Sequence, residues 1–385
     1  MYKASAIIIV GIFVWVAVYY IFSIATPTVT YVASSDQAHI IETNHVTKDT
    51  SITYTILFLG DVMLDRGVAQ HAERYGADKL FAGVKELLTS QDAVIANLEG
   101  TITDNQSVSA KNNSILRFTF KPTLAVDILK DIKVSAVSQA NNHSSDFGKD
   151  GYLQTKKYLD QAGITSFGSA RNDMHISDSI LVSGRNVEGK SVTEPLKICL
   201  VGYHDLYTYD ATPALLEVDR LKKETLANNE NCNLIILFAH WGDEYVQEPS
   251  SRQKELAHGF IDAGADLVIG AHPHVVQPYE IYKNKAIFYS LGNFMFDQDF
   301  SYNTTHGLAV LMEVSNSKKD MDGVNGANNT NKTGSTNIAK NLTYKQIPIS
   351  IIQSEASVSN PEDAKKILKV VSGNEAKDKF VLEEE

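Results

Sequence analysis

The feature that most constrains the fold is an alternation of short apolar runs with amphipathic segments, which begins at Ile52. Runs such as ITYTILFL, DAVIANL, LIILFA and DLVIGA have the length and the β-branched content of buried strands. Between them lie helical segments such as LFAGVKELLTS, SSRQKELAHGFIDAG and DGYLQTKKYLDQAG, the last of which ends at Gly163. The alternation predicts an α/β fold in which helices cover a sheet.

Beyond the run DLVIGA the pattern changes to one typical of hairpins. YEIYKNKAIFYSL predicts a hairpin with its turn near Asn284, and GLAVLMEVS and TYKQIPISIIQ predict two further strands. Residues 316–340, rich in Asn, Gly, Thr and Lys, predict a flexible surface insertion between those two strands. Asn360-Pro361-Glu362 predicts the start of a short helix. We therefore expect one domain over residues 52–355, followed by a helix and an acidic tail over 356–385.

The N-terminal segment predicts a membrane anchor. Ala4 to Ala25 contain no charged residue over 22 positions, and a helix of that length spans a bilayer core at about 1.5 Å per residue. Lys3 precedes this run and the next Lys or Arg is Lys48, which favours a cytoplasmic N-terminus. We expect a single-pass transmembrane helix at 1–25, a linker at 26–51 and an extracytoplasmic domain in the cell membrane. The alternative is a signal peptide cleaved after Ala25.

Charge and cysteine content exclude two classes of protein. A net charge of −11 argues against nucleic-acid binding, and means that a polyanionic ligand must be met by local positive charge or by metal. The two cysteines, Cys199 and Cys232, form no CxxC motif, which excludes a zinc ribbon. Cys199 reads as a small buried side chain, and a disulfide with Cys232 stays open as an alternative outside the cytoplasm.

Polar side chains directly follow five of the predicted strands. They are Asp61, Asn97 with Glu99, Asn141 with Asn142 and His143, His240 with Asp243 and Glu244, and His272 with His274. Singly, each has a structural explanation such as a turn, a cap or a satisfied core histidine. Functional groups of α/β folds collect at the carboxyl ends of strands, however, so we expect them to meet. Carboxylates, an amide and three histidines together predict one or two divalent metal ions.

His272 and His274 directly follow a predicted strand, and the sequence leaves open whether their rings point to one place. In an extended strand, side chains two positions apart share a face while their immediate neighbours point away. In a tight turn just past the strand, both rings can converge on one point. Convergent neutral imidazoles are suited to zinc, iron or manganese.

Seven motifs in order carry a resemblance to a known family: GDVMLDR, ANLEGTIT, FTFKP, ANNHSSDFG, AHWGDEY, GADLVIGAHPHVVQPYE and IFYSLGNFMFD. The chain resembles the CapA family of poly-γ-glutamate capsule synthesis proteins from about Ile52 to Gln298. That family is similar to the calcineurin-like metallophosphoesterases. The resemblance implies a four-layer αββα sandwich of two mixed sheets, and it agrees with an N-terminal membrane anchor.

The resemblance also implies roles for individual residues. The implied metal ligands are Asp61, Glu99, Asn142, His240, His272 and His274. His143 matches the residue that contacts a scissile phosphate and helps to protonate the leaving group. Asp146 is a candidate for orienting His143, with N-capping of the following helix as the alternative. Arg66 and Asn293 are candidates for substrate binding; a surface role for Arg66, and a hydrogen bond from Asn293 to a ligand histidine, are the alternatives.

Two positions depart from the superfamily pattern. Met63 stands where its first motif has a histidine, and Glu99 is one methylene longer than the usual aspartate. The resemblance therefore implies one firmly held metal ion and a second that is held weakly or not at all, with manganese, zinc or iron as candidates.

Two classes of function follow from these patterns. The first is an extracytoplasmic metal-dependent hydrolase acting on a phosphoester or an amide of the cell envelope, within capsule synthesis or unrelated to it. The second is a non-catalytic, membrane-anchored component of capsule polymer synthesis or export. Its expected partners are membrane proteins of that machinery and an anionic polymer.

Overall fold

The computed structural model describes residues 52–112, 114–169, 177–186, 188–192, 195–206, 212–227, 232–316 and 340–373. The expected anchor (1–25), the linker (26–51), the acidic tail and nearly all of the expected insertion lie outside these residues. Within the described part of the chain, no helix is long and apolar enough to cross a membrane.

The larger sheet combines parallel and antiparallel strands. Its order is β17-β16-β15-β1-β2-β5-β6, and β8 and β14 also pair with β1. The strands are β1 (Ile52–Val62), β2 (Ala93–Leu98), β5 (Val134–Ser138), β6 (Thr165–Phe167), β8 (Arg185–Asn186), β14 (Asn293–Met295), β15 (His306–Asn316), β16 (Lys340–Ile352) and β17 (Glu355–Val358). Strands β1, β2, β5 and β6 run parallel, so their carboxyl ends lie at one edge.

The smaller sheet is also mixed. Its order is β12-β13-β11-β10-β9-β7, in which β9, β10, β11 and β13 run parallel. The strands are β7 (Ser177–Val182), β9 (Leu196–His204), β10 (Leu234–His240), β11 (Leu267–Ala271), β12 (Tyr279–Tyr282) and β13 (Lys285–Phe288). A separate pair of short strands, β3 (Thr101–Ile102) and β4 (Thr119–Phe120), runs parallel.

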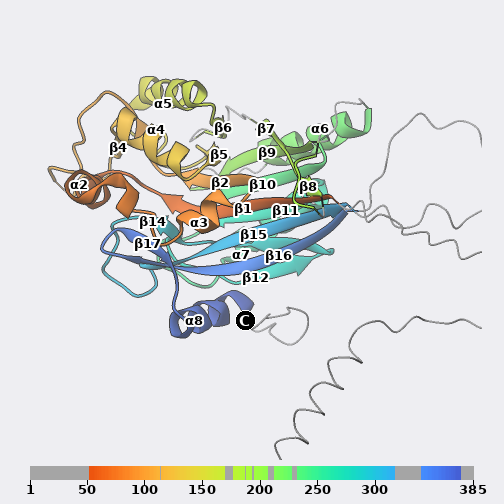
Figure 1. Ribbon diagram of the computed structural model, residues 1–385. Coiled ribbons are helices and arrows are strands. Elements are labelled where there is room, and N and C mark those ends of the chain that lie inside the picture. The colour runs from red at the N-terminus through yellow and green to blue at the C-terminus, as the bar shows by residue number, and fades with distance from the viewer. Residues whose placement is uncertain are drawn as a thin grey trace, which may run out of the picture. The chain divides into compact units, whose positions relative to one another are not determined.

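Helices cover the outer face of each sheet (Figure 1). On the larger sheet lie α2 (Arg66–Tyr75), η1 (Ala77–Lys79), α3 (Lys85–Thr89), α4 (Pro122–Asp131) and α5 (Gly148–Ala162). On the smaller sheet lie α6 (Thr212–Ala227) and α7 (Ser251–Ala263), and α8 (Pro361–Ser372) packs against the core between the sheets.

Strand alternation produces the layering. In β1, Leu57 and Leu59 pack in the core shared with the helices, whereas Ile56 and Phe58 pack in a second core with residues of the smaller sheet such as Phe238. Successive side chains of a strand point to opposite faces, so one strand contributes to both cores. A third core lies between the smaller sheet and its helices. The described residues thus form helix, sheet, sheet and helix layers, and the predicted α/β fold with mixed sheets is confirmed.

Several local predictions are also confirmed. The hairpin of β12 and β13 turns at Lys283 and Asn284, whose φ values of 50° and 62° suit a two-residue turn. The side chain of Asn360 caps α8 by accepting from two backbone N–H groups of its first turn. Cys199 and Cys232 form a disulfide with a Cα–Cα distance of 5.6 Å, which decides the alternative left open by the sequence.

Candidate metal centre

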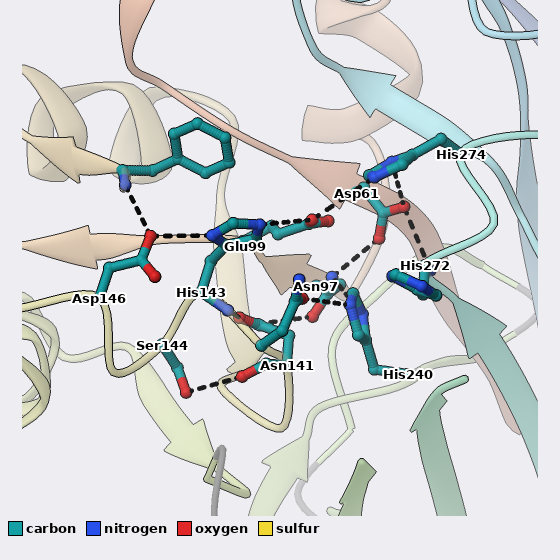
Figure 2. A network of polar contacts seen from close by, with 12 residues as sticks. Asp61, Asn97, Glu99, Asn141, His143, Ser144, Asp146, His240, His272 and His274 are labelled. Carbon is teal, nitrogen blue, oxygen red and sulfur yellow. Dashed lines mark hydrogen bonds and ion pairs between the residues drawn. The ribbon is translucent and has the colours of Figure 1, made fainter. Parts of the chain in front are cut away.

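The polar strand ends of both sheets meet at one place. Asp61 of β1 lies opposite Asn97 of β2, which in turn lies opposite Ser138 of β5. In the smaller sheet His240 of β10 lies opposite Ala271 of β11. Figure 2 shows side chains that follow these strands pointing toward one another. Six of the side chains that were expected to meet lie in two compact groups, and Asp243 belongs to neither group.

Two glycines allow the strand ends to approach this closely. A Cβ atom at Gly60 would lie 1.9 Å from the backbone oxygen of Gly292, and one at Gly270 would lie 1.9 Å from that of Tyr289. Backbone hydrogen bonds cross at both places, from Asp61 to Gly292 and from Leu291 to Gly270, each 3.0 Å long. A side chain at either glycine would push the donor residues of the two sheets apart.

The turn after β11 answers the question raised by its two histidines. His272 and His274 have φ values of 96° and 56°, which non-glycine residues seldom adopt. The ring centroid of His272 lies 4.7 Å from that of His240 and 5.9 Å from that of His274. The backbone therefore turns the rings toward one point, and strain of this kind is typical of functional sites.

The described residues contain two groups of three metal-type donors. One consists of Asp61, Glu99 and His240, which are all buried, and the other of Glu244, His272 and His274. Within each group, one donor atom from every residue lies within 4.8 Å of the others. Five of these six residues are predicted ligands; Glu244 stands in a motif quoted above, but the sequence assigned it no role.

An asparagine network orients His240. Asn97 donates through Nδ2 to Oδ1 of Asp61 at 2.8 Å and contacts Nδ1 of His240 at 3.2 Å. Its own Oδ1 accepts from Nδ2 of Asn141 at 3.0 Å. The other nitrogen of His240, Nε2, lies 2.8 Å from Oδ1 of Asn142. Because Asn97 holds Nδ1, Nε2 is the nitrogen left for a ligand.

Asn97 and Asn141 are site residues to which the sequence assigned no role. A signal was present for Asn97, which stands at the end of a predicted strand in the same ANLEGTIT motif as Glu99. For Asn141, a turn explanation was equally good, and only the fold shows that it binds Asn97 and the backbone oxygen of Leu98.

His274 is oriented by a similar arrangement. Its Nδ1 lies 2.9 Å from Oδ1 of Asn293 and 3.3 Å from Oδ2 of Asp61, while its Nε2 faces Glu99 Oε1 at 3.6 Å. The amide nitrogen of the buried Asn293 donates to Gln298 and to the backbone oxygen of Thr304. Asn293 therefore makes the hydrogen bond to a candidate ligand histidine that was the alternative to substrate binding.

The environment of the Glu99 carboxylate shows whether these residues fit a metal ion. It is fully buried, and neither of its oxygens has a hydrogen-bond partner. The nearest ring nitrogens, Nε2 of His274 and of His143, lie 3.6 and 3.9 Å from Oε1. Nδ1 of the buried His272 also lacks a hydrogen-bond partner. A buried carboxylate without hydrogen bonds is strongly destabilising unless a cation compensates it, so the donor set fits a divalent ion.

The protonation states follow from burial and neighbouring charge. Burial raises the pKa of Glu99 well above its ordinary value, and lowers that of His240 well below 6.5. Burial and the nearby His274 lower the pKa of His272 to about 3. For His274, burial is outweighed by Glu99 and Asp61, which raise its pKa to about 9. His240 and His272 are therefore neutral imidazoles, the form that binds metal.

His143 lies beside the donor groups and is held by Asp146. Its Nδ1 lies 2.8 Å from Oδ2 of Asp146, and the same oxygen accepts from the backbone N–H of Phe118 at 2.7 Å. The N-cap residue of α5 is Phe147, which makes no side-chain capping bond. The alternative that Asp146 caps α5 is thus wrong, because its carboxylate is directed at His143 and Phe118.

Arg66 differs from the surface residue considered above. It is 9% exposed, forms an ion pair with Asp297, and stacks on Phe118 with its Cζ 4.8 Å from the ring centroid. Its positive charge is therefore largely compensated within the protein.

Fold and site together define a two-sheet α/β protein with a candidate divalent-metal centre at the carboxyl ends of its strands. The family model described as "Bacterial capsule synthesis protein PGA_cap" matches residues 55–298. The chain belongs to this family of bacterial capsule synthesis proteins.

Individual relatives agree with the family. The chain is 29% identical to "Capsule biosynthesis protein CapA" of Bacillus anthracis over 308 residues, which cover 76% of this chain and 72% of that protein. It is 31% identical to "PGA biosynthesis protein CapA" of Bacillus subtilis over 252 residues, and the match spans 63% of each chain. Among solved structures, the calcineurin-like phosphoesterase YfkN of Bacillus subtilis is 14% identical with a TM-score of 0.43, covering 83% of this chain and 96% of that one.

Proposed function

We propose that this protein is a membrane-anchored, extracytoplasmic component of capsule polymer synthesis or export that works through a divalent metal centre. The observation that carries the metal centre is the buried Glu99 carboxylate, which lacks hydrogen bonds and faces His143 and His274. The names of the Bacillus relatives support poly-γ-glutamate or a related anionic polymer as the capsule polymer that is made or exported.

The ligand set follows from the site geometry. Asp61, Glu99 and His240 would hold an ion. Asn142 would be a fourth ligand, because its amide oxygen lies 2.8 Å from Nε2 of His240. Manganese, zinc and iron suit mixed carboxylate and imidazole donors. The four layers, together with the motif order, support assignment of the domain to the metallophosphoesterase-like class.

The site supports hydrolysis of an anionic ester or amide. A bound divalent ion would polarise the scissile group and lower the pKa of a water molecule. His143 would carry a proton to the leaving atom, because its Nε2 faces the centre while Nδ1 is held by Asp146. Asp146 fixes the orientation of the His143 ring. Since Arg66 is paired with Asp297, a bound metal ion would supply positive charge for an anionic substrate at this place.

A second candidate function is polymer binding without turnover. The exposed ring of Tyr245 lies 6.1 Å from that of His274 and 5.2 Å from the exposed ring of Phe300. Exposed aromatic rings beside the candidate metal centre offer an apolar surface for packing against a polymer chain, which supports a binding role. A hydrolase acting on an envelope substrate unrelated to capsule is a third candidate, and the same chemistry would apply to it.

One assay separates these candidates. The purified full-length chain is loaded with manganese, zinc or iron, and its metal content and its hydrolysis of an aryl phosphate are measured. We expect metal-dependent hydrolysis that His143→Ala abolishes without loss of metal, whereas His71→Ala, in a residue paired with Glu355, leaves both unchanged. Bound metal without hydrolysis of phosphate or amide substrates would support the binding function. A chain that binds none of these ions would contradict the proposal.

Membrane anchoring rests on the uncharged run from Ala4 to Ala25 and is tested separately. Cell membranes washed with alkaline carbonate should retain the chain, and protease added to intact spheroplasts should cleave it. Release by the wash, or protection from the protease, would contradict this part of the proposal.

A further inference from the structure

Glu244 is an exposed acid whose carboxylate lies among the donors of the metal centre. One of its oxygens lies within 4.8 Å of donor nitrogens on His272 and His274. The neighbouring acid Asp243 is equally exposed but belongs to neither donor group. The position of Glu244 is therefore specific within its own loop.

The site lacks the metal-binding histidine expected at position 63. Met63 occupies the place where a first-motif histidine was expected, but its side chain is fully buried in the core between the larger sheet and its helices. Its sulfur accepts a 3.0 Å hydrogen bond from the backbone N–H of Asp65. Met63 is therefore packed between the larger sheet and its helices and is not available as a metal ligand.

The loop that carries Glu244 is fixed against the turn that carries the two histidines. The backbone N–H of Trp241 donates to Ala271 at 3.1 Å, and that of Tyr245 donates to Pro273 at 2.8 Å. Nε2 of Gln277 donates to the backbone oxygen of Val246 at 2.8 Å. These bonds on both sides of Glu244 hold its carboxylate near the imidazoles without requiring it to be buried.

A second observation points independently to a ligand. Nδ1 of His272 is buried and has no hydrogen-bond partner, although an unpaired buried ring nitrogen is destabilising. A metal ion would satisfy it.

We propose that Glu244 replaces the missing first-motif ligand and, with His272 and His274, holds a second divalent ion beside the one held by Asp61, Glu99 and His240. This inference rests on the proposed metal centre. Because Glu244 is exposed and the other group is buried, the second ion is the one open to solvent and exchanges more readily.

Metal counting tests the inference. The full-length chain, Glu244→Gln and Asp243→Asn are each titrated with manganese, and bound ions are counted after desalting and by calorimetry. We expect two ions for the wild type and for Asp243→Asn. For Glu244→Gln we expect one retained ion and a second site weakened at least about 100-fold, beyond the 10–100-fold typical of an outer-shell change.

A thiol in place of the carboxylate gives a signature that a merely structural role would not. Both cysteines of the chain are in the disulfide, so Glu244→Cys introduces the single free thiol. Thiolate favours softer ions such as cadmium and cobalt. With cobalt, Glu244→Cys should show a thiolate-to-metal absorption band, and Asp243→Cys should not.

The outcomes separate this inference from the proposed function. Equal numbers and affinities of ions in the wild type and Glu244→Gln, or a wild type that binds a single ion, would overturn the role of Glu244 while leaving the first metal site intact. A wild type that binds no ion would overturn both. The absence of the cobalt band in Glu244→Cys would also contradict ligation at this position.

Discussion

Nε2 of His240, at the end of β10, lies 2.8 Å from Oδ1 of Asn142, which follows β5 in the other sheet. The hydrogen bond places a nitrogen and an oxygen donor of the candidate ligand set in direct contact across the two sheets. Asn97 occupies the second nitrogen of His240, so an ion entering the site would replace this bond by two metal–ligand bonds. The candidate metal centre therefore draws its donors from both sheets.

Removing the charge of Glu99 should separate folding from metal binding. Metal at 100 times its dissociation constant should stabilise the wild type by about 2.7 kcal/mol, and this gain should vanish in Glu99→Gln. Without metal, Glu99→Gln should change stability little, because it removes a buried carboxyl without hydrogen bonds but also removes the charge that faces His274. Thermal unfolding with and without a chelator measures both effects. The exposed Glu313→Gln serves as control, and an equal metal response in Glu99→Gln would contradict the assignment.

Asn97→Ala should weaken metal binding although Asn97 is not itself a proposed ligand. It holds His240 and Asp61 in place, and loss of such an outer partner weakens binding about 10–100-fold. Calorimetric titration with manganese measures the change. Asn105→Ala, in a residue bonded to Thr103, is the matched control and should bind as the wild type does. An unchanged affinity in Asn97→Ala would show that the asparagine network is dispensable.

If the chain turns over an aryl phosphate, Asp146 and His143 should act as one unit. His143→Ala should lower kcat about 10²–10⁴-fold, the range of a positioned general acid. Asp146→Asn should lower kcat with little change in KM, because Asp146 orients the ring of His143. Adding Asp146→Asn to His143→Ala should cost nothing further in kcat. Independent, multiplicative losses would argue that Asp146 acts through Phe118 instead.

Breaking the Arg66–Asp297 pair should destabilise the fold more than removing it. The side chains are 11% and 18% exposed, so Asp297→Asn should lower the free energy of unfolding by roughly 1–3 kcal/mol, less than the 3–5 kcal/mol of a fully buried pair. Arg66→Met combined with Asp297→Asn should recover part of the loss. Urea unfolding measures the two variants. A double variant less stable than the sum of the single changes would contradict compensation between these residues.

The disulfide should stabilise the smaller sheet. It closes a loop with a sequence separation of 33, for which chain entropy predicts a contribution of about 3–4 kcal/mol. In urea unfolding, the double variant Cys199→Ala with Cys232→Ala should have a free energy of unfolding lower than that of the wild type by about that amount. A reductant should lower the free energy of unfolding of the wild type but not that of the double variant. An unchanged stability in the double variant would mean that the bridge does not constrain the unfolded chain.

The strands that build the site were predictable because their apolar runs are long and uninterrupted. β1, β2, β10 and β11 coincide with runs recognised in the sequence, and the polar residues after them meet as expected. The short strands β3, β4 and β14 have two or three residues and carry no periodicity. Their pairing depends on neighbours that are distant in sequence, so single-sequence patterns do not reveal it.

The site was predictable where residue type implied chemistry and unpredictable where position came from packing. His272 and His274 stand out as donors in any reading, but the convergence of their rings depends on two positive φ angles. Glu244 resembles an ordinary exposed acid until the backbone bond from Tyr245 to Pro273 places it beside them. The burial of Met63 in the helix-side core likewise follows from the fold.

The proposed ligation of a divalent ion by Asp61, Glu99 and His240 is tested most directly by crystallography. Crystals of the full-length chain are grown with manganese and measured at the manganese absorption edge. We expect an anomalous peak within bonding distance of Nε2 of His240 and of the carboxylates of Asp61 and Glu99. An absent peak, or a Glu99 carboxylate turned away from every anomalous peak, would contradict it.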